Sequence, residues 1–582
     1  MSPFISVCAC CWFFVAASAS RDLTYRDSDI LSLNTAQRTS EQPYRTGFHF
    51  QPTKNWMNDP NGLMYYKGYY HLFYQWNPYG AVWGTITWGH AVSTDMLQWH
   101  ILDVALAPDQ WYDINGCWTG SATFVAANRP VLIYTGWTNI SSSVEHKIQV
   151  QAVAVPHDSE DPLLQKWIKV NDNPILVAPI GIDPTEFRDP TTAWIGADGK
   201  WRMVVGSKRK EDGVALLYRS SDFLHWHKAE DPLHSVVDTG MWECPDFYPV
   251  SIGGQNGLDT SVNGPDVIHV LKASLANDKH DYYVVGTYNS DYDTFTPADS
   301  SHNVGIGLRY DYGKFYASKT FYDSAKGRRI LFGWVNESSS AKNDIVKGWS
   351  SLQGFPRKIW LNGETKSSIL QWPIQEIETL RRRSDSLSGI FLEANSVTRV
   401  TGVEGAQLDV EVEFDMPSLN EAEILEVDSS NVQLACSQVG KSHKGAVGPF
   451  GLLVLASEDL KEQTAVFFYA VLTGGGWKTL ICSDQGRSSL NNDVDKTSYG
   501  SYMSVPSNDK SLRLRTLVDH SIVETFAQGG EICITSRVYP VKAVNNQAHL
   551  YLFNNGSVPV RVSHMIAWEL ASTTIDVDVP AR

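Results

Sequence analysis

The chain has 582 residues, which is too long for a single hydrophobic core and predicts at least two domains. Its 64 acidic residues outnumber the 48 basic ones, giving a formal charge of −16 with no Lys/Arg stripe. Such a chain is a poor candidate for binding nucleic-acid phosphates and would be repelled by anionic membranes, so we expect neither as a partner. The 20 Trp, 25 Tyr and 22 Phe instead favour a neutral polar ligand, of which a sugar is the obvious class.

The first twenty residues have the pattern of a secretion signal. An apolar run from Phe4 to Ala17 is followed by small residues, which predict cleavage after Ala19 or Ser20. The alternative is a membrane anchor, but the run is too short to span a bilayer. We therefore assign residues 1–20 to a signal peptide and expect a secreted protein.

Secretion makes the remaining cysteines and the glycosylation sequons informative. Five cysteines follow the signal: Cys117, Cys244, Cys436, Cys482 and Cys533. An odd number implies at least one free thiol or an intermolecular bond. Three sequons, at Asn139, Asn336 and Asn555, could carry N-linked glycans in a secreted chain.

A short strand-like pattern recurs five times in the first part of the chain. Each copy has a turn, an apolar-aromatic run and then a glycine or small polar residue. The copies lie at 67–74, 129–136, 199–206, 281–286 and 328–334. Repeats of this kind predict the blades of a β-propeller, and five copies predict five blades. The alternative is a set of unrelated buried strands in a sandwich.

The repeat stops after about Trp360. Pro373 and the helical spacing of Ile374–Arg383 predict a short linker helix within residues 366–385. Beyond it, alternating runs predict a β-sandwich. These runs lie at 407–414, 465–471, 512–526, 532–539 and 549–553. We therefore expect an all-β protein, with a five-bladed β-propeller over 44–365 and a C-terminal β-sandwich over 386–582.

Three carboxylates lie at related places in the repeats. Asp59 precedes Tyr70 of the first copy by eleven residues, and Asp189 precedes Trp201 of the third by twelve. Near-equal offsets predict the same element in different blades, and therefore a common axis. Glu243 precedes the fourth copy by a longer stretch. Acidic residues before proline are usually only turn formers, but three on one axis, each near an aromatic residue, favour a sugar site.

The segments around these carboxylates resemble the signature blocks of glycoside hydrolase family 32. They read Trp-Met-Asn-Asp-Pro-Asn-Gly (56–62), Phe-Arg-Asp-Pro (187–190) and Trp-Glu-Cys-Pro-Asp-Phe (242–247). The similarity runs from about Tyr44 to near the C-terminus, with further blocks at 116–123, 309–313, 316–319 and 519–524. The plant branch fits best, which contains cell-wall-type β-fructofuranosidases (acid invertases) and fructan exohydrolases. The resemblance implies the same propeller and sandwich that the repeats predict.

The resemblance also implies a role for each carboxylate. Asp59 would be the nucleophile, Glu243 the general acid and then base, and Asp189 would hold the fructosyl hydroxyls and stabilise the transition state. A retaining pair of this kind needs carboxyl groups about 5–5.5 Å apart, and their proximity would keep the acid protonated. Matching substrate-contact positions are Asn58, Gln75, Trp83, Trp118, Thr119, Ser121 and Arg188, with Arg188 orienting Asp189 and the Trp residues forming an aromatic wall.

One segment departs from the plant invertase pattern. At 286–293 the chain has Asn289 where invertases carry an Asp that helps to hold the glucosyl unit of sucrose, and Tyr292 where they carry a Lys. Fructan exohydrolases lack that Asp too, and an amide is a weaker acceptor than a carboxylate. We therefore expect an exohydrolase acting on fructan. An invertase acting on sucrose, a fructosyltransferase and a non-catalytic fructan-binding protein remain as alternatives.

The remaining expectations concern location and cofactors. Pro245 is the cell-wall-type residue of the family, which predicts an apoplastic enzyme. The sequence contains no His-Glu-x-x-His, Cys/His cluster, nucleophile elbow or phosphate loop, so we expect no metal and no cofactor. Cys436 and Cys482 share the C-terminal region and form the expected disulfide, and Cys117, Cys244 and Cys533 are expected to stay reduced. We expect a monomer.

Overall fold

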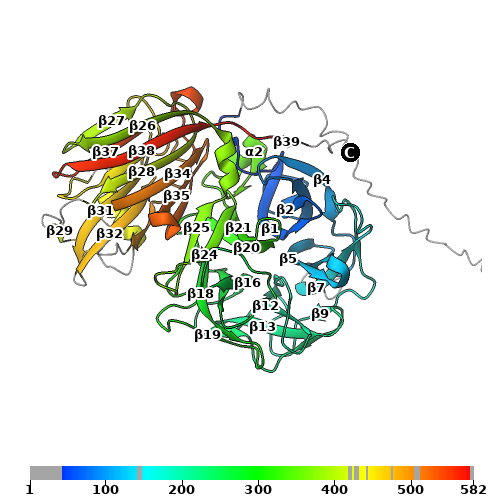
Figure 1. Ribbon diagram of the computed structural model, residues 1–582. Helices are drawn as coiled ribbons and strands as arrows, with labels where there is room; N and C mark the ends of the chain where they lie inside the picture. The colour runs from blue at the N-terminus through cyan, green and yellow to red at the C-terminus, as the bar shows by residue number, and fades with distance from the viewer. Residues whose placement is uncertain are drawn as a thin grey trace, which may run out of the picture.

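The computed structural model describes residues 42–139, 147–416, 423–424, 432–440, 443–473, 476–503 and 511–576. The expected signal peptide, residues 1–20, lies outside these ranges. Among the described residues, strands form seven sheets, five in the N-terminal part of the chain and two in the C-terminal part (Figure 1). This confirms the predicted all-β fold of a propeller followed by a sandwich. Within the described ranges, no helix is long and apolar enough to cross a membrane.

Five sheets stand around a common axis as the blades of the propeller (Figure 1). Blade 1 contains β1 (Asn55–Tyr66), β2 (Tyr69–Asn77), β3 (Thr87–Ser93) and β4 (Trp99–Leu106). Blade 2 contains β5 (Gly116–Val125), β6 (Arg129–Asn139), β7 (Lys147–Pro156), β8 (Trp167–Lys169) and β9 (Leu176–Val177). Blade 3 contains β10 (Phe187–Arg188), β11 (Trp194–Ile195), β12 (Trp201–Arg209), β13 (Asp212–Ser220), β14 (Trp226–Lys228) and β15 (His234–Val236).

The last two blades follow in chain order. Blade 4 contains β16 (Trp242–Ser251), β17 (Val267–Leu275), β18 (His280–Asn289) and β19 (Thr294–Pro297). Blade 5 contains β20 (Phe315–Asp323), β21 (Arg328–Val335), β23 (Leu352–Gln353), β24 (Arg357–Leu361) and β25 (Ile369–Pro373). Helix α2 (Ala341–Lys347) precedes β22 (Trp349–Ser350), which lies parallel to β1, and the late strand β39 (Ile575–Asp576) lies parallel to β4. Blade 1 is thus extended on both edges by segments from far along the chain.

The propeller core lies between neighbouring blades. Leu132, Ile133 and Tyr134 of β6 are completely buried. Leu132 and Tyr134 pack with blade 1 and Ile133 packs with blade 3, because successive side chains of a strand point to opposite faces. Burial on both faces explains why the repeats are uninterrupted apolar runs instead of alternating ones.

Four copies of the repeat fall on the second strand in the sheet order of a blade, namely β2, β6, β12 and β21. The copy at 281–286 does not. The segment 281–286 lies on β18, the third strand of blade 4. The second strand is β17, which follows the long connection 252–266 after β16. This connection accounts for the longer stretch between Glu243 and the fourth copy of the repeat.

The C-terminal part is a sandwich of two antiparallel sheets. One sheet has the order β26 (Arg381–Leu392), β38 (Val560–Leu570), β28 (Gln407–Asp415), β34 (Ser511–Asp519), β35 (Ile522–Ala527) and β36 (Ile532–Arg537). The other has the order β27 (Ser396–Val400), β37 (His549–Asn554), β30 (Phe450–Ala456), β31 (Thr464–Thr473), β32 (Gly476–Asp484) and β33 (Tyr499–Met503), with β29 (Glu423–Ile424) beside β31. Phe414 of the first sheet contacts Phe450 and Phe468 of the second in the core between them.

The expected linker helix at 366–385 is wrong in extent and type. The propeller continues through β25 to Pro373, and the only helical segment there is a short 3-10 helix, η2 (Gln375–Leu380). The sandwich begins at Arg381, which pairs with Leu570 of β38 and lies 3.6 Å from the ring centre of Trp568. Pairing with β38 outweighs the local helical spacing of Ile374–Arg383, because propensity is a weak determinant beside tertiary contacts.

Candidate active site

Irregular backbone places the three predicted carboxylates at one end of the propeller. The register of β1 breaks between Met57 and Pro60, around Asp59, and that of β16 breaks between Glu243 and Asp246. Such bulges occur next to active sites because they re-aim a side chain. Asp189, directly after β10, has a positive φ of 65°. Conformations of this kind cost energy and persist where the surrounding structure enforces them.

Cys244 brings the carboxylates together. Its thiol lies 3.5 Å from Oδ2 of Asp59 and 3.6 Å from Oδ2 of Asp189, and its backbone N–H donates to the same Asp189 oxygen at 2.8 Å. Glu243 is the preceding residue, and its Oε1 accepts from Nη2 of Arg188 at 3.0 Å. The structure therefore gathers residues of blades 1, 3 and 4, which are far apart in the sequence, around one point.

Asp59 is held by a closed set of hydrogen bonds. Thr119 donates to its Oδ2 at 2.5 Å and Asn58 donates to its Oδ1 at 3.0 Å. Asn58 also donates to Gln75 at 2.8 Å, and Gln75 donates to Thr119. Burial raises the pKa of Asp59, while the bonds from Thr119 and Asn58 oppose this rise by favouring the ionised form. Asn58, Gln75 and Thr119, which the resemblance implies as substrate contacts, thus lie around Asp59.

Two cationic side chains and one hydroxyl contact the carboxylate of Glu243. Besides Arg188, Nζ of Lys279 lies 3.2 Å from its Oε2, and the Tyr316 hydroxyl donates to the same oxygen. Burial alone would raise the pKa of Glu243, but Arg188, Lys279 and Tyr316 outweigh it and lower that pKa. The pKa of Asp189 is raised to about 6, mainly by burial. The pKa of Glu243 is therefore shifted downward and not upward as expected, because the donors gather at this carboxyl.

An aromatic group borders the site on the side of blades 1 and 2. The ring centres of Trp83 and Trp118 are 6.1 Å apart, and Trp137 lies 4.8 Å from Trp118 and 6.1 Å from Trp83. Trp83 is 48% exposed, so part of its side chain is open to solvent. Trp137 was not predicted, although it follows the second repeat directly. A second pair, Trp56 and Trp334, lies 5.7 Å apart.

Ser121 links the segment after Asp189 to Lys319. It is buried, donates to the Pro190 carbonyl at 2.8 Å and accepts from Nζ of Lys319 at 3.1 Å. Lys319, Tyr316 and Lys279 are site residues that the sequence reasoning did not assign. The family 32 block at 316–319 contains two of them, at the register break of β20. Lys279 had no signal in the sequence, since it lies in the turn between β17 and β18.

Two family models together span this architecture. The model described as glycosyl hydrolases family 32 N-terminal domain matches residues 49–373, and the family 32 C-terminal model matches residues 376–569. The chain belongs to glycosyl hydrolase family 32. The boundary between the two family 32 matches falls at η2, between the last propeller strand and the first sandwich strand.

Relatives within family 32 cover nearly the whole chain. The acid beta-fructofuranosidase of Vigna radiata var. radiata is 50% identical over 575 residues, 97% of this chain and 87% of that protein. The beta-fructofuranosidase insoluble isoenzyme CWINV3 of Arabidopsis thaliana is 50% identical over 549 residues, 92% of this chain and 91% of that protein. The crystal structure of fructan 1-exohydrolase IIa from Cichorium intybus superimposes with a TM-score of 0.88 at 47% identity, covering 92% of this chain and 99% of that chain.

The expectation for Asn289 in this family 32 site is wrong. Glu243 pairs with Ser274 of β17, which pairs with Asp281 near the start of β18. Asn289 ends β18, eight residues further, which corresponds to about 26 Å at the usual rise per strand residue. Its side chain accepts from the backbone N–H groups of Asp291 and Tyr292 and caps a turn. Asn289 therefore lies at the opposite end of blade 4 from Glu243.

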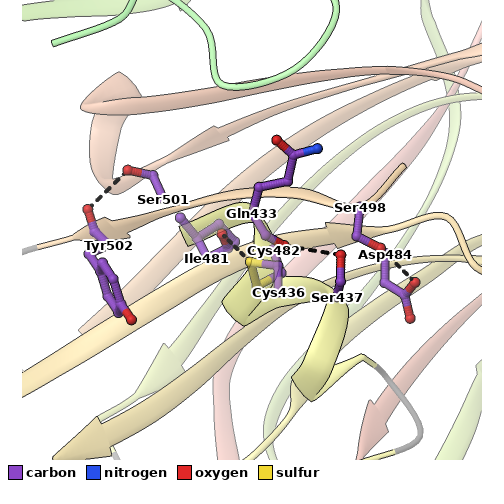
Figure 2. Close-up of a disulfide and its surroundings, with 9 residues drawn as sticks. All are labelled: Gln433, Cys436, Ser437, Ile481, Cys482, Asp484, Ser498, Ser501 and Tyr502. Atoms are coloured by element: carbon purple, nitrogen blue, oxygen red, sulfur yellow. Dashed lines mark hydrogen bonds between the residues drawn. A yellow bond between two sulfur atoms is a disulfide. The ribbon is translucent and has the colours of Figure 1, made fainter. Parts of the chain in front are cut away.

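The remaining predicted positions of this family 32 protein are its cysteines and its sequons. A disulfide joins Cys436 of α3 (Val432–Val439) to Cys482 of β32 (Figure 2). Cys117, Cys244 and Cys533 are free thiols and are buried. Asn336 is exposed, and Asn139 and Asn555 are partly exposed. Among the described residues, no group of three or more His, Cys, Asp and Glu could hold a metal ion.

Proposed function

We propose that the protein is a secreted, retaining glycoside hydrolase that releases terminal non-reducing β-D-fructofuranosyl residues. The observation that carries the proposal is the meeting of Asp59, Asp189 and Glu243 around Cys244, with Arg188 bonded to Glu243. Two carboxyl groups in different surroundings, with a third beside them, supply a nucleophile, an acid/base and a group that binds sugar hydroxyls.

Asp59 would attack the anomeric carbon. Its Oδ2 is held by the Thr119 hydroxyl and its Oδ1 by the Asn58 amide, so the carboxylate is already oriented before it reacts. Those donors also stabilise the ionised form against burial. Asp189, beside it, would accept hydroxyls of the fructosyl ring and stabilise the positive charge that develops on the sugar.

Glu243 would protonate the leaving oxygen and then activate water. An acid must carry a proton, whereas Arg188, Lys279 and Tyr316 lower the pKa of this carboxyl. Hydroxyl groups of a bound sugar that draw the Arg188 guanidinium or the Lys279 ammonium away from Glu243 would raise its pKa. The same sugar would thus complete the site and let Glu243 take up from solvent the proton that it delivers to the leaving oxygen.

We favour a fructan as the substrate, with sucrose as the second candidate, and the reason lies where the leaving group binds. The leaving group must lie beside Glu243, and Lys279 shows that the turn at 276–279 borders this place. Asp278, the carboxylate of this turn, is engaged by the Tyr282 hydroxyl at 2.8 Å and by the N–H of His280. The carboxylate of this turn is therefore already bonded within blade 4 and is not reserved for the small glucosyl group of sucrose. A longer fructan depends less on such a bond because it can reach Trp83, Trp118 and Trp137.

Hydrolysis of three substrates tests both parts of this proposal. Purified protein is incubated separately with sucrose, a short levan and inulin, and kcat/KM is measured from released fructose. We expect release from all β-fructosides that reach the site, faster from a fructan than from sucrose. Faster hydrolysis of sucrose would favour the invertase alternative, and no release from any of them would contradict the proposed activity.

Export to the cell wall is part of the proposal. It is supported by the apolar run at 4–17, by Pro245, and by relatives named insoluble isoenzymes, although another relative is named vacuolar. Expression of the full chain in plant cells, followed by N-terminal sequencing of the protein in the apoplastic fluid, tests it. We expect a new N-terminus after about Ala19 or Ser20.

A further inference from the structure

The backbone that carries Asp59 is held by a residue from blade 5. At the register break of β1, Asn58 and Asp59 face a single β2 residue, Gln75. The Asn58 carbonyl, which shares a peptide group with the Asp59 nitrogen, accepts a hydrogen bond of 2.7 Å from Nε2 of Gln353. Gln353 is completely buried. Its amide therefore acts directly on the irregular part of β1.

Gln353 is itself held on two sides. Its backbone N–H donates to the Phe50 carbonyl at 2.9 Å, and it pairs with Trp334 of β21. Two residues later, the N–H of Phe355 donates to Oε2 of Glu524 at 3.1 Å. Glu524 belongs to β35 of the sandwich, so the C-terminal domain reaches the segment that carries Gln353.

The same sandwich hairpin also holds the segment that leads into β1. Glu524 pairs with Nε2 of His49 at 2.9 Å, and Nδ1 of His49 pairs with Asp519 at 2.8 Å. Asp519 accepts from the backbone N–H groups of Gly47, Phe48 and His49. Arg357 adds an ion pair of 2.8 Å to Glu524. These side chains are completely buried, and buried hydrogen bonds of this kind hold their partners rigidly.

We propose that Gln353 is a positioning residue for the nucleophile, and that Glu524 makes the sandwich domain part of this support. Glu524 anchors the segments 47–50 and 353–357, and Gln353 joins them at the Asn58 carbonyl. Neither residue touches the reacting atoms. Their effect is to keep the bulge, and with it the Asp59 carboxylate, in the geometry for attack, where a displacement of about 1 Å can cost up to a hundredfold in rate. The proposal rests on the proposed role of Asp59.

Gln353→Met is the first test, because methionine has a similar length and no donor. We expect kcat to fall about tenfold or more, with KM within about twofold and a nearly unchanged melting temperature, since orientation of the nucleophile enters the chemical step. A kcat equal to that of the wild type in a folded Gln353→Met variant would overturn the proposal.

Gln353→Glu gives a readout that a merely structural role would not move. A protonated carboxyl can donate to the Asn58 carbonyl, whereas an ionised one cannot and would repel it. Burial would keep the pKa of the introduced carboxyl above the ordinary value of about 4.3. The activity of Gln353→Glu relative to the wild type should therefore rise as the pH is lowered. An activity ratio of Gln353→Glu to wild type that does not change with pH would overturn the positioning role. This test holds even if Gln353→Met fails to fold.

Glu524→Gln tests the part played by the sandwich, with Asp409→Asn as its matched control. Asp409 is an equally buried carboxylate of the sandwich, bonded to Arg381 and Arg515. The kcat of each variant is measured well below the melting temperatures of both variants. Glu524→Gln should lower kcat, and Asp409→Asn should not. Equal losses of kcat would overturn the role of Glu524. Asp59→Ala is assayed alongside: activity remaining in that variant would overturn the proposed function itself, whereas its loss beside an unaffected Gln353→Met would overturn only the positioning role.

Discussion

Nη2 of Arg188 lies 3.0 Å from Oε1 of Glu243. Arg188 directly precedes Asp189 in the chain, and the sequence suggested that it orients this carboxylate; in the structure its side chain bonds to the proposed acid. Its charge lowers the pKa of Glu243 and opposes the effect of burial on Asp189. One guanidinium therefore favours the ionised form of two carboxyl groups from neighbouring blades.

The two proposed reacting carboxylates should be essential for turnover but not for folding. Asp59→Ala and Glu243→Ala are each expected to lower kcat on the better β-fructoside substrate by at least about a hundredfold, the lower end of acid–base contributions. Circular dichroism and thermal melting should show folded proteins. Azide should partly restore Glu243→Ala, because a small anion needs no general base to attack the fructosyl intermediate. Near-normal turnover by either variant would disprove the assigned roles.

Lys279→Met should move one limb of the pH profile. The Lys279 ammonium lowers the pKa of Glu243, so its removal should raise that pKa and shift the limb that belongs to Glu243 to higher pH. The shift should be modest, because the Lys279 side chain is 59% exposed and solvent screens its charge. The measurement is kcat/KM for the wild type and the variant from about pH 3 to 8. Lys358→Met serves as the control. Lys358 lies over the ring of Trp360 and is far from Glu243 in the sequence.

Asn289→Asp should leave the choice between sucrose and fructan unchanged. The residue caps a turn at the end of blade 4 opposite Glu243, so a carboxylate there cannot reach the leaving group. The ratio of kcat/KM for sucrose to that for a short levan should agree with the wild type within about twofold. A rise of tenfold in sucrose hydrolysis would show that Asn289 does contact the leaving group and would restore the original expectation.

Removal of the disulfide should affect stability without affecting turnover. Cys436→Ser together with Cys482→Ser is expected to cost about 2–4 kcal/mol of unfolding free energy, because the bond joins α3 to β32 in the sandwich. Denaturant unfolding measures the loss, and kcat should stay unchanged. Peptide mapping without reduction should recover the pair linked, and a peptide linking Cys533 to either cysteine would contradict the pairing.

Stability should fall at alkaline pH through His49. Asp519 and Glu524 outweigh the effect of burial and raise the pKa of His49 from 6.5 to about 9. The stabilisation is therefore fully present below about pH 6.5 and is lost as the pH rises through 9, on the order of 3 kcal/mol in all. Unfolding free energies measured between these values should show this slope, and His49→Gln should lack it. A wild-type curve that stays flat over this range would contradict the prediction.

The sequence by itself determined the number of blades and the identity of the three carboxylates. Apolar runs between turns mark strands wherever blades pack on both faces, and Asp59, Asp189 and Glu243 lie in short motifs that can be recognised without knowing where they meet. The resemblance also implied Asn58, Gln75 and Thr119 as substrate contacts, and the structure places them around Asp59.

Only the tertiary structure decided which end of a blade a residue occupies and what surrounds a carboxylate. Neighbouring strands of an antiparallel blade run in opposite directions, so the second strand ends at the site and the third strand begins there. Segment 281–286 reads like a second strand, which would have placed Asn289 beside Glu243; as the third strand, β18 carries it to the opposite end and leaves Lys279 at the site. The downward shift of the pKa of Glu243 likewise depends on Arg188, Lys279 and Tyr316, which reach this carboxyl from three separate parts of the chain because of tertiary packing.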